Sequence, residues 1–165
     1  MDKDTTIKRA RELRRADKLE ESQQILRDLL ETHPEDPTVL FEVGGAYDVL
    51  GDVNEAISYY EDAIEMGLDG AELQECLICL GISYRTIGEF GQAVSILQDA
   101  VEQFPNDNSA RVFLALAHYS DDTPDEAVRL LLDVLLQTTK DEGILAYADT
   151  LDFYKDNLDE VWDEE

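Results

Sequence analysis

The sequence predicts an all-α fold, an α-solenoid of four helix-turn-helix repeats followed by a capping helix. The stretch from Pro37 to Gly70 carries two apolar stripes at helical spacing, separated by Gly51 and Asp52. Its 34-residue pattern recurs once before it and twice after it. Because a single helical hairpin cannot bury both of its stripes, we expect the repeats to stack and to bury one continuous core.

The repeats follow one another within a single domain, 1–165. We expect repeats at 3–36, 37–70, 74–107 and 108–140, a capping helix at 141–162 and an acidic tail at 163–165. Residues 71–73 are extra between the second and third repeats, which predicts that the next helix starts one turn early. The last helix is expected to cover the end of the solenoid, because terminal repeats need a polar outer face.

Turn chemistry indicates where the hairpins bend. Gly51 suits the left-handed conformation that follows many helices. Asp52 with Glu55, and Thr123 with Glu126, resemble capping boxes that begin the second helices of their repeats. The turn at residues 120–123, Ser-Asp-Asp-Thr, has no glycine.

Composition is that of a folded, strongly acidic protein, with 44% hydrophobic residues and a formal net charge of -26. The first 30 residues carry eight Lys or Arg against seven Asp or Glu, whereas the remaining 135 carry five against 32. This surface repels phosphate backbones, so nucleic acid is excluded as a partner and basic proteins are favoured. The acids could also serve only for solubility, or reflect a salt-adapted proteome.

Targeting and membrane signals are missing from the sequence. Residues 1–10 have no apolar run of the kind a signal peptide requires, and no apolar segment approaches the length of a membrane span. Two cysteines in one apolar helix fit a reducing compartment better than a disulfide framework. We therefore expect a cytoplasmic protein that does not contact membranes.

The repeat pattern resembles the tetratricopeptide repeat. Small residues at positions 8, 20 and 27 of a 34-residue unit, an aromatic residue at 11, Gly at 15 and Pro at 32 carry this resemblance over residues 3–140. It implies a right-handed superhelix whose concave face, lined by the first helix of each repeat, holds an extended or helical peptide. The runs DPTVLFEVGGAYDVLG, FPNDNSARVFLALAHYS and GILAYADTLD further resemble short bacterial tetratricopeptide proteins of unassigned function that are thought to dimerise.

The resemblance also implies which residues face the groove. Positions 5, 9 and 12 of each first helix are expected to point inward. Position 5 of the first repeat is Ile7. The other inward positions, with the neighbouring Arg15, are the candidate peptide-groove residues Arg11, Arg14, Arg15, Phe41, Gly45, Asp48, Ile78, Ile82, Arg85, Val112, Leu116 and Tyr119. Members that bind free carboxylates use asparagines which this chain lacks, so that specificity is not expected.

Arginines gathered on one face of so acidic a chain could hold an acidic peptide by forked hydrogen bonds. Alternatively, they could pair internally with Glu12, Glu42 or Asp48. Two functions follow: a scaffold that binds a peptide or helix in its groove, or a self-associating homodimer that buries the groove or the C-terminal helix.

Catalytic, cofactor and metal sites are not expected. Cys76 and Cys79 share a helix face, but a zinc site needs further soft ligands and none is at hand, so packing is the better interpretation. His33 and His118 have no partner at ligand or triad spacing, and capping and core packing are expected of them. The acids around Asp156 lack the pattern of a calcium loop.

Overall fold

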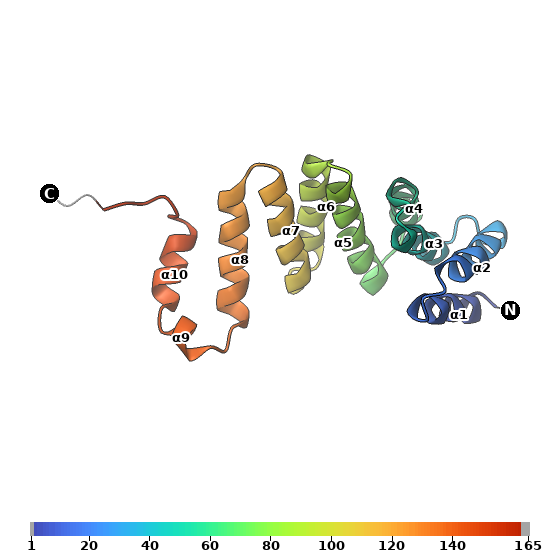
Figure 1. Ribbon diagram of the computed structural model, residues 1–165, viewed down its shortest axis with the longest axis horizontal. Helices are drawn as coiled ribbons and strands as arrows, with labels where there is room; N and C mark the ends of the chain where they lie inside the picture. Colours follow the sequence, from blue (N-terminus) through green and yellow to red (C-terminus); the bar gives the residue numbers. More distant parts are fainter. Residues whose placement is uncertain (1, 163–165) are drawn as a thin grey trace. The chain divides into compact units, whose positions relative to one another are not determined.

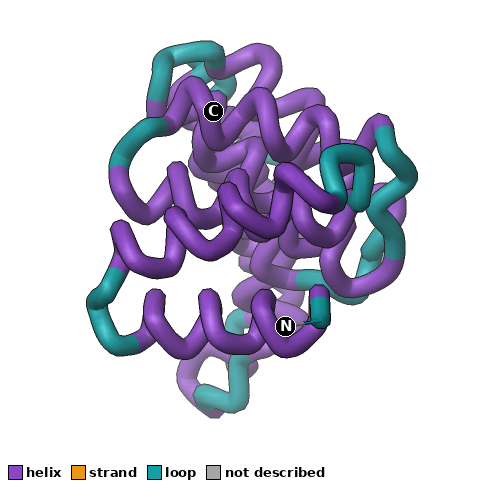
Figure 2. The backbone as a smooth tube through the Cα atoms, turned by 90° about the vertical axis from the view of Figure 1, so that its right-hand side faces the viewer, coloured by secondary structure: helices purple, strands orange, loops and turns teal. Residues whose placement is uncertain are grey.

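The structure, a computed structural model, describes residues 2–162, and these contain helices and loops but no strand (Figure 2). The predicted all-α class is confirmed. The described residues form two compact units that divide between Glu89 and Phe90, in the turn of the third predicted repeat. We call them the first unit and the second unit, and each is described by itself.

The first unit contains five helices among its described residues (Figure 1). They are α1 (Lys3–Arg15), α2 (Leu19–Thr32), α3 (Pro37–Leu50), α4 (Val53–Glu65) and α5 (Gly70–Thr86). Each helix packs against the next, and α3 also touches both α1 and α5. The helix α5 begins four residues before the third repeat at Gln74, which confirms the early start.

Close packing inside the first unit depends on small residues. A Cβ atom at Gly44 would lie 2.7 Å from the ring of Tyr60, so glycine is required where α3 meets α4. In the first repeat the buried Ser22 replaces alanine and donates its hydroxyl to the carbonyl of Ala10 at 2.9 Å. The polar side chain is therefore satisfied in the core at the point where α1 meets α2.

The turns of all four hairpins use the same backbone conformation at position 15 of the repeat. Gly51 and Gly88 have φ angles of 86° and 85°, and Asp17 and Asp122 reach 59° without being glycine. Aspartate is among the few residues that adopt the left-handed region at modest cost. The turn without glycine thus keeps the geometry of the others.

The capping boxes predicted after these turns do not form. Asp52 makes no side-chain hydrogen bond to its helix. The Thr123 hydroxyl donates to the carbonyl of His118 instead, and Glu126 pairs with Arg129 at 2.8 Å. These side chains have turn and ion-pair partners that compete with the helix amides.

The second unit contains α6 (Phe90–Gln103), α7 (Asn108–Ser120), α8 (Pro124–Thr138), α9 (Glu142–Leu145) and α10 (Ala148–Lys155). Successive packing joins α6 to α7 and α7 to α8, and α10 covers α8. Lys155 of α10 bonds Asp133 of α8 at 3.2 Å. None of the helices in residues 2–162 combines the length and apolar composition that crossing a bilayer requires.

The prediction of one helix over 141–162 is wrong. The helix is interrupted at Ala146 and Tyr147 and ends at Lys155, where the Asn157 amide donates to the carbonyl of Phe153 at 2.8 Å. The acids that follow Lys155 would lie at the negative end of the helix dipole, which disfavours its extension. The predicted acidic tail at 163–165 lies outside the described residues.

Candidate functional site

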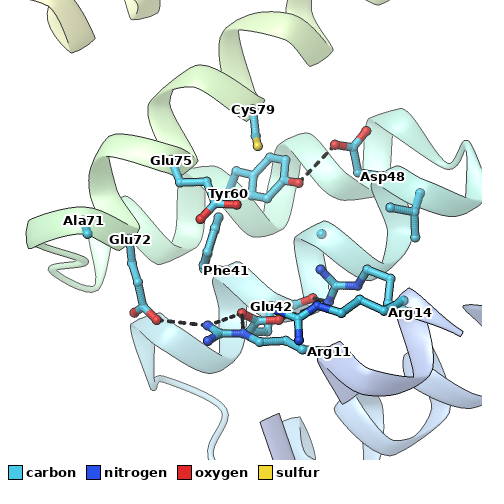
Figure 3. Close-up of a pocket in the computed structure, with 13 residues that line it drawn as sticks. Arg11, Arg14, Phe41, Glu42, Asp48, Tyr60, Ala71, Glu72, Glu75 and Cys79 are labelled. Carbon is cyan, nitrogen blue, oxygen red and sulfur yellow. Dashed lines mark hydrogen bonds and ion pairs between the residues drawn. The ribbon is translucent and has the colours of Figure 1, made fainter. Parts of the chain in front are cut away.

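A pocket of about 570 Å³ opens on the first unit, between α1, α3, α4 and α5 (Figure 3). Three arginines of α1 line one part of the pocket, and carboxylates from α3 and α5 together with uncharged side chains line the rest. The lining residues are Arg11, Arg14, Arg15, Phe41, Glu42, Gly45, Asp48, Val49, Tyr60, Ala71, Glu72, Glu75 and Cys79. Its volume lies in the range of ordinary ligand sites.

Glu42 is a buried carboxylate that two arginines neutralise. Its side chain is 4% exposed, and it accepts from Arg11 Nε at 2.7 Å and from an Arg14 guanidinium nitrogen at 3.0 Å. Arg11 reaches Glu72 at 3.3 Å as well, and the bond to Glu42 raises the pKa of Arg11 above its ordinary value. Figure 3 shows both arginines converging on Glu42. The internal pairing considered from the sequence is therefore observed for Arg11 and Arg14, with Glu42 as the partner.

Gly45 makes room for this arrangement. A Cβ atom placed on Gly45 would lie 3.1 Å from a terminal nitrogen of Arg14. The Arg14 guanidinium of α1 therefore packs directly against the backbone of α3. Glycine at position 45 leaves the space that this guanidinium occupies.

The remaining carboxylates of the pocket are not neutralised in this way. Asp48 accepts from the Tyr60 hydroxyl at 3.2 Å, and neither Asp48 nor Glu75 forms an ion pair with any residue in 2–162. Burial, together with the nearby charges of Asp48 and Glu75, raises the pKa of the Cys79 thiol to about 11. Both carboxylates therefore act on the same thiol at the pocket wall.

Six of the twelve predicted groove residues line this pocket: Arg11, Arg14, Arg15, Phe41, Gly45 and Asp48. Ile78, Ile82 and Arg85 of α5 do not; Ile78 and Ile82 are half-buried, and Arg85 is exposed. Val112, Leu116 and Tyr119 lie on α7 in the second unit, where Tyr119 is 68% exposed. A role in binding stays a prediction for all twelve.

Sequence reasoning missed the contribution of α5 to the pocket. Ala71, Glu72, Glu75 and Cys79 face it in place of the predicted Ile78 and Ile82. The signal was the three-residue insertion, because the extra turn it adds to α5 carries Ala71 and Glu72. Tyr60 belongs to the second apolar stripe of residues 37–70, yet its hydroxyl reaches Asp48.

Cys76 is packed in the core, and both histidines form hydrogen bonds with neighbouring threonines. Cys76 is fully buried, as its packing interpretation predicts, and burial raises the pKa of its thiol to about 12. His118 shares a hydrogen bond with the Thr123 hydroxyl at 2.9 Å, and His33 shares one with Thr32 at 2.8 Å. Within residues 2–162, no three His, Cys, Asp or Glu side chains are placed to hold a metal ion.

The second unit exposes large apolar side chains. Among those that are more than a third exposed, the largest fractions are 68% for Tyr119, 67% for Tyr147, 81% for Val161 and 72% for Trp162. Three of these four follow α8. A surface of this kind is a candidate for association.

A family model described as a tetratrico peptide repeat matches residues 37–151. No match was found among curated proteins. The family match confirms the resemblance recognised in the sequence, although it begins only at the second predicted repeat.

Solved structures resemble the chain in fold. MamA from Desulfovibrio magneticus RS-1, residues 41 to the end, has a TM-score of 0.73 at 18% identity, with 93% of this chain and 85% of that chain covered. YrrB, described as a tetratricopeptide repeat protein with an unusual peptide-binding site, has a TM-score of 0.71 at 24% identity, with 93% and 78% covered. A tetratricopeptide repeat protein from Parabacteroides merdae has a TM-score of 0.73 at 21% identity, with 93% and 59% covered.

Proposed function

Because the chain belongs to the tetratricopeptide repeat family, we propose that it is a non-catalytic scaffold that binds a protein partner through a peptide or helix. The binding site is the pocket of the first unit. The observation that carries this proposal is the open, charged hollow formed by α1, α3 and α5, which are the first helices of three successive repeats. The peptide-binding site for which YrrB is described supports the same use of this fold.

The chemistry of the pocket favours binding over catalysis. Its one thiol, Cys79, is held protonated at neutral pH by a pKa of about 11, whereas a nucleophilic cysteine needs a lowered pKa. Arg11 and Arg14 are occupied by Glu42. The groups present can form hydrogen bonds and ion pairs with a partner.

The test fills the pocket without disturbing the core. Ala71 is exposed and lines the pocket, so Ala71→Trp blocks it, whereas Ala16→Trp places the same side chain at an exposed position outside it. We expect partners captured from the native cell, identified by mass spectrometry, to be lost with Ala71→Trp and kept with Ala16→Trp. Capture of the same partners by both variants would overturn the proposal.

Self-association is the second candidate function, and the exposed apolar residues of the second unit favour it. Trp162 is the single tryptophan of the chain and is 72% exposed, so its fluorescence reports on this surface alone. If a homodimer buries the C-terminal segment, sedimentation equilibrium should show twice the chain mass of 18.6 kDa and Trp162 emission should shift to shorter wavelength on concentration. A monomer at all concentrations would exclude this function.

A cytoplasmic location is part of the same proposal. Two free cysteines, one buried and one half-buried, suit a reducing compartment. A bacterial source remains a prediction from the narrower sequence resemblance.

A further inference from the structure

We propose that the pocket of the first unit recognises a basic side chain of its partner, a lysine or arginine whose cation lies between Asp48 and Glu75. This inference rests on the proposed function and names the chemistry of the ligand. It reverses the expectation drawn from the sequence, in which the arginines hold an acidic peptide.

Two of the three arginines that line the pocket, Arg11 and Arg14, already pair with a carboxylate of the protein itself. The Glu42 side chain is buried, and a carboxylate this deeply buried is tolerated only when cations compensate it. Arg11 and Arg14 supply that compensation at 2.7 and 3.0 Å. An acidic ligand that drew them away would leave Glu42 buried and unpaired, so an anion has little to gain from Arg11 or Arg14.

Two carboxylates of the pocket, Asp48 and Glu75, form no ion pair with any residue in 2–162. Glu75 is exposed on α5, and the Asp48 carboxylate on α3 accepts a hydrogen bond from the Tyr60 hydroxyl alone among the residues that the structure describes. Asp48, Glu75 and Cys79 all line the pocket, and the charges of both carboxylates, as well as that of Arg14, act on the Cys79 thiol. In Figure 3, Glu75, Cys79 and Asp48 lie apart from the cluster of Arg11, Arg14 and Glu42. The pocket therefore has a neutralised side and an anionic side.

The rest of the pocket suits the stem of a basic side chain. Lysine and arginine carry aliphatic stems that pack along apolar surface while the charged head stays with polar groups. Val49, 46% exposed, and Cys79 supply such surface beside the two carboxylates. A volume of about 570 Å³ leaves room for a side chain together with its peptide backbone.

The net charge of -26 attracts any cation over a distance of about a Debye length, so the test must separate this general attraction from the pocket. A phage-displayed library of random peptides is selected on the wild-type protein, with counter-selection on Ala71→Trp. Enriched sequences are then made as fluorescein-labelled peptides, and their affinities are measured by fluorescence polarisation. The variants are Asp48→Asn with Glu75→Gln, and the matched control is Glu31→Gln with Glu35→Gln, which removes the same charge from exposed sites outside the pocket.

We expect enriched peptides to share Lys or Arg at one position and to lose about tenfold or more in affinity with the pocket variant, because charge-assisted hydrogen bonds are removed. The control variant should retain affinity within about twofold. Peptides that bind through Asp or Glu, or basic peptides that the two double variants weaken equally, would overturn the inference and leave the scaffold function standing. Failure to enrich any peptide that distinguishes wild type from Ala71→Trp would overturn both.

Discussion

The two units of this chain solve the same packing problem with different surfaces. The first unit has 21 acidic and nine basic residues and the second has 18 and four, so both are strongly anionic. In the first unit, a buried carboxylate and two arginines line a charged pocket. In the second, aromatic and aliphatic side chains are left exposed along the C-terminal segment. The repeat pattern therefore specifies the helical hairpin, whereas the exposed side chains of each repeat decide what it can bind.

The largest effect should come from breaking the ion cluster of the first unit. We expect Glu42→Gln to lower the free energy of unfolding by about 3 kcal/mol, near the lower limit for removing one member of a buried pair, because Arg11 and Arg14 keep partial access to water. Urea denaturation followed by circular dichroism measures this change. Glu31→Gln, at an exposed site, should change stability by less than about 0.5 kcal/mol. Equal effects would show that Glu42 is not a structural charge.

Thiol labelling reports on the first unit alone, because both cysteines lie in α5. Burial raises the pKa of Cys79 from 9.0 to about 11, so at pH 8 its thiolate fraction, and its labelling rate, should be about a hundredfold below that of an unfolded control. The neutral thiols favour the folded state, so the stability they contribute is present below pH 9 and falls as the pH rises toward 12. Labelling of the native protein as fast as in urea would contradict this environment.

Replacing one glycine by alanine in each unit should change stability in opposite directions. Gly44→Ala should destabilise the first unit by about 2 kcal/mol, because the added methyl group meets the Tyr60 ring. Gly91→Ala in α6 should stabilise the second unit by about 0.5 kcal/mol, because a Cβ there meets nothing within 4 Å. Thermal unfolding of both variants provides the measurement. A loss of stability in Gly91→Ala would mean that the site is not open.

The smallest expected effect concerns the left-handed turn residue that both units contain. Asp17→Gly and Asp122→Gly should each stabilise the protein by about 0.5 kcal/mol, because glycine adopts the left-handed conformation at φ 59° without a steric penalty. Denaturation midpoints should rise equally in the two variants. A gain at one site only would show that the equivalent turns differ in strain.

Much of the fold could be predicted from the sequence, and the reasons are local. Helix spacing, Gly51 and the three extra residues before Gln74 each act within a few residues, so the hairpins and the early start of α5 follow from them. The end of the C-terminal helix at Lys155 did not follow, because apolar residues at helical spacing continue to Leu158 and Trp162 and favour a longer helix.

The candidate site was only half predictable. The arginines and Asp48 were found by their position in the repeat, but their roles depend on distances between helices that no local pattern encodes. Glu42 was one of three possible partners for the arginines. The approach of α1 to α3 distinguishes it from Glu12, which lies on α1 itself, and the point of α3 that Arg11 and Arg14 reach distinguishes it from Asp48, which also lies on α3. The share of α5 in the pocket depends likewise on its packing against α3 and α4.

The close approach of Arg14 to Gly45 also constrains how this chain can vary. Because a Cβ at position 45 would lie 3.1 Å from the guanidinium, Arg14 would have to shift by a small distance, so the two positions are coupled. Gly45→Ala alone would press on one of the two cations that compensate Glu42, whereas lysine at position 14 would keep a positive charge in a thinner side chain. The effects of substitutions at the two sites should therefore be non-additive.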